Sequence, residues 1–194
     1  MKNKKLLIAL AVVAVFVIWL FSGYNGMVEK QEQATTELAN VEASYQRRAD
    51  LLPNLAKVVK EYAKHEQETF TAVTQARAAA SSIKLDASDL TPEKLKQYQE
   101  AQGQISAALG KLMVVSERYP ELKANENFKD LQVQLEGTEN RINEARRKYN
   151  EAVQDYNQTV RRMPNALIAG MFGFNKMNKF EAAVGADKAP DLDI

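Results

Sequence analysis

The stretch from residue 127 to residue 163, NFKDLQVQLEGTENRINEARRKYNEAVQDYNQTVRRM, decides the fold class of this chain. Its apolar residues recur every three or four positions, which is the spacing of one face of an α-helix. They are Phe128, Leu131, Leu135, Ile142, Ala145, Tyr149, Tyr156, Val160 and Met163. The pattern predicts a helix over about 127–162, roughly 54 Å long at 1.5 Å per residue, with a seam typical of helices packed nearly antiparallel.

Three further stripes with the same spacing precede this one. They cover residues 34–52, 55–80 and 95–119. Pro53 separates the first two, and because proline lacks an amide proton it either kinks a helix or starts a new one. The other breaks are the loop 81–91, where Thr91 caps a helix that begins with Pro92, and Tyr119-Pro120. We therefore expect an all-α fold, an antiparallel up-and-down bundle of about four long helices.

The composition argues against two classes of function, nucleic-acid binding and thiol chemistry. The chain has 194 residues, of which 45% are hydrophobic and 26% charged, with no cysteine and a net charge of +1. Beyond Lys2, Lys4 and Lys5 the chain holds 23 basic and 25 acidic residues. A nearly neutral bundle argues against nucleic-acid binding, which depends on neutralising phosphates. The lack of cysteine excludes disulfides and thiolate chemistry.

The segment from Leu6 to Phe21 contains no charged residue and predicts one transmembrane helix. A cleaved signal peptide is the alternative, but the bulky Phe21 and Tyr24 stand two positions before Gly23 and Gly26, where cleavage needs small residues. Three lysines precede the segment, and cytoplasmic flanks carry the excess of Lys and Arg. This predicts a single-pass cell-membrane protein with its N-terminus in the cytoplasm and its bundle outside, in the periplasm if there are two membranes.

Polar residues interrupt the apolar seams, and a buried charge is costly unless it is paired. Our first interpretation is an internal polar layer in which Arg48 meets an acid such as Glu66 or Glu139. The alternatives are a groove that recognises a charged ligand, or partial exposure. The candidate layer comprises Arg48, Glu66, Gln102, Thr138, Glu139 and Arg141.

The sequence offers no residue as a candidate for catalysis, metal binding or cofactor binding. His65-Glu66 resembles the start of a zinc-protease helix, but Thr69 stands where the second histidine would be. Gly103 and Gly110 do not form a phosphate loop, and no nucleophile elbow is present. Tyr149-Asn150 and Tyr156-Asn157 repeat at seven residues, which favours core packing with a polar fringe over a base-stacking platform.

The C-terminal part is unusually apolar, and soluble surfaces rarely expose so large an apolar set. Residues 164–182 either fold back on the end of the bundle, touch the bilayer beside anionic headgroups, or receive a partner. The candidate contact residues are Arg161, Arg162, Leu167, Ile168, Met171, Phe172, Phe174, Lys176, Lys179 and Phe180. Residues 183–194 are expected to be a disordered acidic tail.

Several segments carry a resemblance to a known family. They are YNGMVEKQE, RRADLLPNLAKVVKEYAKHE, ARAAA, and the run from ERYPELKANENFKD to IAGMFGF that is followed by FEA. Over residues 24–182 the chain resembles the LemA family. The resemblance implies a membrane anchor and a bundle of four helices, with no established catalytic site, cofactor or biochemical role. From the residues we expect the anchor at 1–23, with its short cytoplasmic stub, the bundle at 24–163, the apolar extension at 164–182 and the tail at 183–194.

The resemblance also marks family signature positions without assigning them a function. They are Arg47, Arg48, Asp50, Pro53, Asn54, His65, Glu66, Tyr119, Pro120, Glu139, Asn140 and Arg141. The chain departs from the family at Met163, where phenylalanine is usual, and at Asn178-Lys179, which replaces a more aromatic run. Descriptions of the family that place its bulk in the cytoplasm disagree with the lysine argument, which we keep.

Three functions remain open. The first is a non-enzymatic scaffold or adaptor of the bacterial cell envelope with an envelope or membrane protein as partner. The second is a lipid-facing protein involved in membrane organisation. The third is a small-ligand or enzymatic bundle around Arg48, His65 and Glu66. A homo-oligomer is also open, because an apolar seam is satisfied equally well within one chain or between chains.

Overall fold

The computed structural model describes residues 2–181, and within them the chain is helical, as predicted. The expected tail at 183–194 lies outside the described residues. The helices are α1 (Lys2–Tyr62), α2 (Gln67–Ser81), α3 (Pro92–Arg118), α4 (Pro120–Ala124), α5 (Glu126–Arg161) and α6 (Asn165–Phe172), with the short 3-10 helix η1 at Ala87–Asp89.

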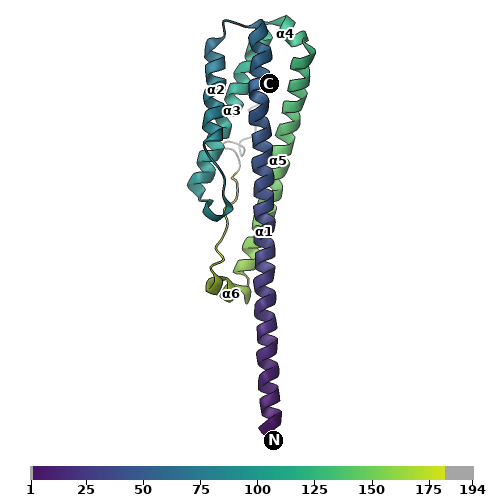
Figure 1. Ribbon diagram of the computed structural model, residues 1–194, viewed down its shortest axis with the longest axis vertical. Coiled ribbons are helices and arrows are strands. Elements are labelled where there is room, and N and C mark those ends of the chain that lie inside the picture. The colour runs from purple at the N-terminus through teal and green to yellow at the C-terminus, as the bar shows by residue number, and fades with distance from the viewer. Residues whose placement is uncertain (1, 182–194) are drawn as a thin grey trace, which may run out of the picture.

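The helix α1 is the spine of the molecule and runs without a break for 61 residues (Figure 1). Pro53 lies inside this helix, so the prediction that a new helix starts there is wrong. A proline inside a helix costs about 3 kcal/mol. Leu52 and Leu55 on either side of it are buried in the core, and burying each contributes about 1.5–3 kcal/mol. The chain instead leaves α1 at residues 63–66, before α2 begins.

The two long helices α1 and α5 lie antiparallel. Tyr62 at the end of α1 accepts a hydrogen bond from Asn125, just before α5 (3.0 Å), and Lys30 near the middle of α1 pairs with Asp155 near the end of α5 (3.9 Å). The helices α2 and α3 form a second antiparallel pair beside them (Figure 1), joined where Arg118 donates to Glu66 (2.9 Å).

Side-chain caps start two of these helices. The hydroxyl of Thr91 accepts from the amide of Lys94 at 3.2 Å, directly before Pro92, as the sequence predicts. Asn125 accepts from the amide of Phe128 at 3.0 Å. Each bond satisfies an amide that the first helical turn leaves free, which is typically worth about 1 kcal/mol.

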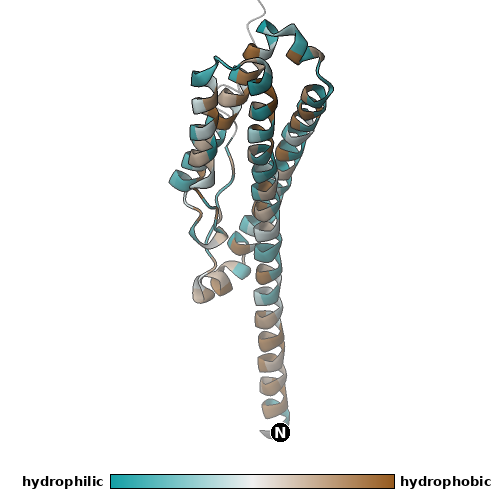
Figure 2. Cartoon of the chain, turned by 45° about the horizontal axis from the view of Figure 1, so that its top comes forward, coloured by the Kyte–Doolittle hydropathy of each residue, from teal (hydrophilic) through white to brown (hydrophobic). Residues whose placement is uncertain are grey.

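The interior divides into three apolar clusters along the long axis. The upper cluster gathers around Leu52, Leu112 and Phe128, and the middle cluster around Tyr45, Tyr98 and Tyr149. The lower cluster contains Met27, Tyr156, Val160, Ile168 and Ala169. Of the described residues 2–181, only α1 continues below it, and its surface there is apolar and exposed (Figure 2).

The segment after α6 returns toward the middle of the bundle. Gly173 ends α6 in the left-handed conformation (φ 76°), which glycine adopts without steric cost. Residues 174–181 then run without helical structure along α5 (Figure 1), and we call them the strap. This return closes one side of the groove described below.

Candidate functional site

Arg48 is the buried charge at the centre of the bundle. Only 3% of the residue is exposed, and its guanidinium forms an ion pair with the carboxylate of Glu139 on α5. It also donates from Nη2 to both oxygens of Gln102, the carbonyl at 3.2 Å and Oε1 at 3.1 Å, and from Nη1 to Ser106 at 3.3 Å. The ring of Tyr45 lies 5.2 Å from the guanidinium carbon. These contacts join α1, α3 and α5 at one level.

The other candidate polar residues lie elsewhere. Thr138 is buried but donates only to the carbonyl of Leu135 in its own helix (2.7 Å). Glu66 lies in the break after α1, where it pairs with Arg118 instead of Arg48. Arg141 is exposed and lines a shallow hollow on another face. The polar layer therefore contains neither Glu66 nor Arg141.

The structure does not bring Arg48, His65 and Glu66 together. His65 is exposed in the break after α1, beyond Tyr62, the last residue of that helix. Tyr62 is itself 14 residues beyond Arg48, or roughly 21 Å along the helix. Within residues 2–181, no group of three or more His, Cys, Asp or Glu side chains is arranged to hold a metal ion. A ligand site built on these three residues would need a different geometry.

An open groove of about 1270 Å³ runs along α3, α5 and the strap. Arg48, Gln102 and Glu139 lie in its wall beside the exposed Asn143 and the half-buried Arg146. Arginine and lysine provide seven of its lining residues and glutamate four. The groove therefore carries a net positive charge. The predicted contact residues Arg161, Arg162, Lys176 and Lys179 all border this groove.

Two repeated pairs of side chains on α5 hold the strap. Asn157 donates to the carbonyl of Met177 (2.9 Å) and accepts from its amide (2.9 Å). Asn150, seven residues earlier, forms the same two bonds with Phe180 at 3.0 and 2.9 Å. The hydroxyls of Tyr156 and Tyr149 donate to the carbonyls of residues 175 and 178, at 2.9 and 2.8 Å.

Burial raises the pKa of both tyrosines, so their hydroxyls stay protonated and act as donors. The sequence interpretation of these pairs as core with a polar fringe missed their role. Two signals in the sequence could have indicated that α5 holds the strap. They are the heptad repeat of the Tyr-Asn pairs in α5 and the three-residue repeat in FNKMNKF of the strap.

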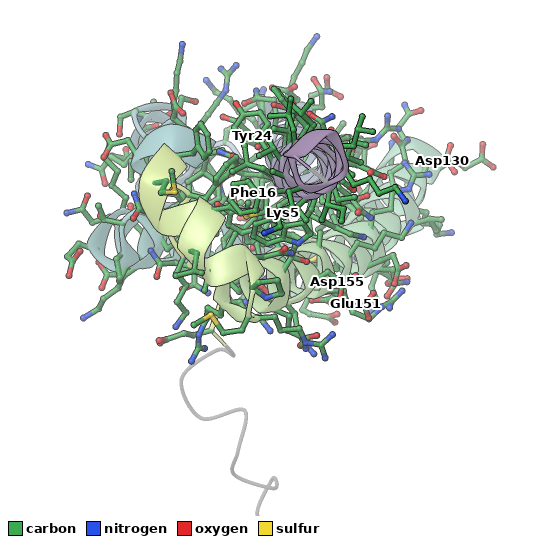
Figure 3. The ribbon with its side chains drawn as sticks, turned by 90° about the horizontal axis from the view of Figure 1, so that it is seen from below. Lys5, Phe16, Tyr24, Asp130, Glu151 and Asp155 are labelled. Carbon is green, nitrogen blue, oxygen red and sulfur yellow. The ribbon has the colours of Figure 1, made fainter. Side chains whose placement is uncertain are left out.

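The lower end of the bundle holds α6 against α1. A Cβ added to Gly23 would lie 2.7 Å from Cδ1 of Ile168 and 3.3 Å from Oδ1 of Asn165, so the two helices touch where α1 has no side chain. The ring of Tyr24 packs edge-on against Phe172 and Phe174, with centroids 5.0 and 5.4 Å apart. Figure 3 shows α6 from below, lying across the base of the bundle beside α1.

The predicted contact residues of the C-terminal part divide into two groups. Ile168 and Phe180 are buried and serve the core, and Phe174 is half-buried. Leu167, Met171 and Phe172 are 59%, 72% and 50% exposed. These three form an apolar surface beside the point where the exposed apolar part of α1 ends. By length and composition, that part of α1 is able to cross a membrane.

Sequence comparison agrees with the family resemblance. The chain is 24% identical over 204 residues to the magnetosome protein MamQ of Magnetospirillum gryphiswaldense, covering 94% of this chain and 74% of that protein. It is 25% identical over 201 residues to the magnetosome proteins MamQ 1 and MamQ 2 of Paramagnetospirillum magneticum, with 94% and 73% covered. The LemA family model matches residues 37–193, most of the sequence, and the chain therefore belongs to the LemA family.

Proposed function

We propose that this protein is a membrane-anchored, non-enzymatic scaffold of the bacterial cell envelope. The observation that supports this most directly is the continuity of α1, a single helix from Lys2 to Tyr62. Its first part is apolar and exposed, while from Met27 onward its inner face belongs to the bundle core. A membrane span and a bundle that share one helix keep a constant orientation to each other, as a scaffold requires.

The upper half of the bundle offers a surface for a protein partner. Val114 on α3 and Val133 on α5 are 62% and 67% exposed. Their neighbours Met113 and Gln132 are in contact, with 3.2 Å between Nε2 and the sulfur, so the two valines lie on adjoining helices. An envelope or membrane protein that docks here would stand above the membrane at the height that α1 sets.

The helix α6 favours a second function, membrane organisation through a lipid-facing base. This helix carries the exposed apolar residues Leu167, Met171 and Phe172 and lies beside α1 at the lower end of the bundle. Helices that expose an apolar face at this level lie in the headgroup region of a bilayer. In this arrangement α6 braces the bundle on the membrane.

The comparisons fit a membrane-associated role. The curated relatives are named as magnetosome proteins, and their names mention no reaction. A structural observation that supports a non-enzymatic role is that Arg48 lies at the centre of the bundle, away from His65 and Glu66 in the break after α1.

Cysteine labelling tests the topology, because the chain has no cysteine of its own. Cysteine placed at the exposed Ser81 should react with a membrane-impermeant maleimide in intact cells, and cysteine at position 3 should react only after the inner membrane is opened. Protection of position 81 together with labelling of position 3 in intact cells would reverse the proposed orientation.

Site-specific photocrosslinking in intact membranes tests the scaffold. A photoreactive residue at position 114 or 133 should capture the same protein, whereas one at the exposed Lys148 on another face should not. If positions 114 and 133 capture only lipid or nothing, the protein-binding surface is not there and the lipid-facing function gains weight.

A further inference from the structure

The lower end of the bundle concentrates positive charge. Between residues 156 and 180 the chain holds four basic residues and no acidic one. They are Arg161, Arg162, Lys176 and Lys179. The part of α1 that packs against this segment, around Trp19, Tyr24 and Met27, lies within residues 6–28, which carry no charge. A chain with a net charge of only +1 therefore gathers its cations where the apolar part of α1 ends.

The height of these cations relative to α1 follows from the ion pair between Lys30 and Asp155. The two helices are antiparallel, so the six residues from Asp155 to Arg161 descend roughly 9 Å, to the level of Tyr24. The apolar run of α1 ends at Phe21, three residues or roughly 4.5 Å below that level. A headgroup layer is roughly 5–7 Å thick. Arg161 therefore lies at headgroup height when the apolar run spans a bilayer.

The strap brings Lys176 to the same end of the bundle. Its neighbour Met177 is fixed on α5, because it exchanges two hydrogen bonds of 2.9 Å with Asn157. Arg161 stands four residues beyond Asn157, one turn further down on the same face of α5. Lys176 and Arg161 both border the lower part of the groove. The lysine is therefore anchored about one helical turn above the arginine.

Three of the four cations have no partner among the described residues 2–181. Arg161, Arg162 and Lys176 are exposed, and within that range their side chains form no ion pair and no hydrogen bond. Lys179 differs from them, because it stands three residues further up the strap and donates to Gln154 (2.9 Å). The charges of the first three are therefore available to a ligand at the level of the headgroups.

We propose that Arg161, Arg162 and Lys176 form a binding site for the phosphate groups of anionic phospholipids, in the leaflet on which the bundle stands. Arginine matches phosphate oxygens with paired N–H donors, and basic residues near an anionic membrane surface are attracted to it. The exposed apolar residues Leu167 and Met171 of α6 lie in the chain between the arginines and the lysine. The inference rests on the proposed lipid-facing base and specifies which lipids that base selects.

Photocrosslinking of the full chain tests the proposal, in nanodiscs of equal parts phosphatidylglycerol and phosphatidylcholine. A photoreactive residue replaces Met163, which directly follows Arg162 and is 74% exposed. Mass spectrometry then gives the ratio of the two captured lipids. The parent chain should favour the anionic lipid by about five-fold or more, the preference that a single cation near an anionic surface typically supplies.

Two variants with equal loss of charge locate the site. The test variant replaces its three cations, and the captured-lipid ratio should fall to near one. The control variant replaces three exposed lysines at the opposite end of the bundle, and the ratio should stay at the parent value. The test substitutions are Arg161→Gln, Arg162→Gln and Lys176→Gln, and the control substitutions are Lys57→Gln, Lys60→Gln and Lys64→Gln. Inorganic phosphate, compared with chloride at equal ionic strength, should leave the parent ratio unchanged.

Equal capture of both lipids by the parent chain would overturn the proposal and leave the lipid-facing base in place. A preference that survives in the test variant would also overturn it, because other residues would then select the lipid. Loss of the preference in phosphate but not in chloride would replace it with a site for the free ion. Capture of neither lipid would contradict the lipid-facing base itself, and this proposal with it.

Discussion

Arg48 and Glu139 form an ion pair whose two side chains differ in their exposure to solvent. The guanidinium side chain is 4% exposed and the carboxylate side chain 45%. Water can solvate Glu139 when its partner is removed, but it cannot reach Arg48. Since an uncompensated buried charge is more costly than an exposed one, the two halves of the pair should respond differently to substitution.

Glu139→Gln should lower the free energy of unfolding by about 3–5 kcal/mol, because it leaves a charge buried. Arg48→Met should lower the free energy of unfolding by less, about 1–3 kcal/mol, because it removes only the hydrogen bonds to Gln102 and Ser106 and leaves no buried charge. Urea unfolding of the full chain in detergent measures both. The exposed Arg141→Gln is the control, with an expected change within about 0.5 kcal/mol. Equal costs for the two variants would contradict the asymmetry.

Gly23 is the second informative residue, because α6 packs where it lacks a side chain. Gly23→Leu should push Ile168 away and separate α6 from α1, whereas Gly26→Leu should not, since nothing lies within 4 Å of an added Cβ there. Trp19, the one tryptophan, packs against this cluster and reports the change. A shift of its fluorescence should appear only in the Gly23 variant. Equal shifts in both would show that α6 does not pack there.

At the scale of elements, the strap depends on two asparagines. Asn157→Ala should leave the backbone amide and carbonyl of Met177 unpaired, and Asn150→Ala should do the same at Phe180. Each substitution should lower the free energy of unfolding by about 1–3 kcal/mol. Hydrogen exchange at those amides should accelerate by about ten-fold or more, most strongly at the amide whose partner was removed. The exposed neighbour Gln158→Ala serves as the control. Unchanged protection in both asparagine variants would mean that the strap is held by other contacts.

The tyrosines of α5 make the strap sensitive to alkali. Burial raises the pKa of Tyr149 above its usual value near 10. Because the folded state favours the protonated form, this contribution to stability is complete below about pH 10 and is lost as the pH rises through the raised pKa. Tyr149→Phe should therefore flatten the decline of unfolding free energy above pH 10, as measured by urea titrations from pH 8 to 11.5. A decline as steep as in the parent chain would exclude Tyr149 as its source.

The sequence predicts some of these elements well and others poorly. It predicts α3 and α5 closely, because Thr91-Pro92 and Tyr119-Pro120 are strong boundary signals and the apolar seams are long. It misplaces the end of α1, since Pro53 is a breaker by propensity while the actual break at residues 63–66, AKHE, contains neither glycine nor proline. Burial on both sides of Pro53 overrides its local preference.

The sequence likewise predicts only part of the candidate site. The sequence marks Arg48 and Glu139 as polar residues in apolar seams, which is a local signal. It does not predict the strap, because the bonds from Asn150 and Asn157 reach backbone atoms 20 to 30 residues away and leave no pattern of paired side chains. It also cannot separate buried Ile168 from exposed Leu167, since both lie in one apolar run.

At the scale of the whole molecule, three features converge on one level of the long axis. The exposed apolar part of α1 ends there, α6 lies beside α1 there, and the strap begins there (Figure 1). A bilayer around α1 would meet Leu167, Met171 and Phe172 on its surface. Met171→Asp with Phe172→Asp should therefore loosen the bundle from the membrane while leaving α1 inserted.

The loosening is measurable as a wider distribution of distances between the membrane surface and a fluorophore at position 114, in nanodiscs of anionic lipid. Val133→Asp is the control for an added charge, because Val133 is an exposed apolar residue on α5, far from α6. A distribution unchanged by the double substitution would mean that α6 does not brace the bundle.

The most direct test of the proposal that the bundle stands on the bilayer through α6 is the depth of residue 171. A fluorophore on Met171→Cys in nanodiscs should be quenched by lipids brominated near the headgroup, to a level well above a fluorophore on Val114→Cys at the far end of the bundle. This result would place α6 in the interface. Quenching at position 171 as weak as at position 114 would contradict the proposal and leave α1 as the only contact with the membrane.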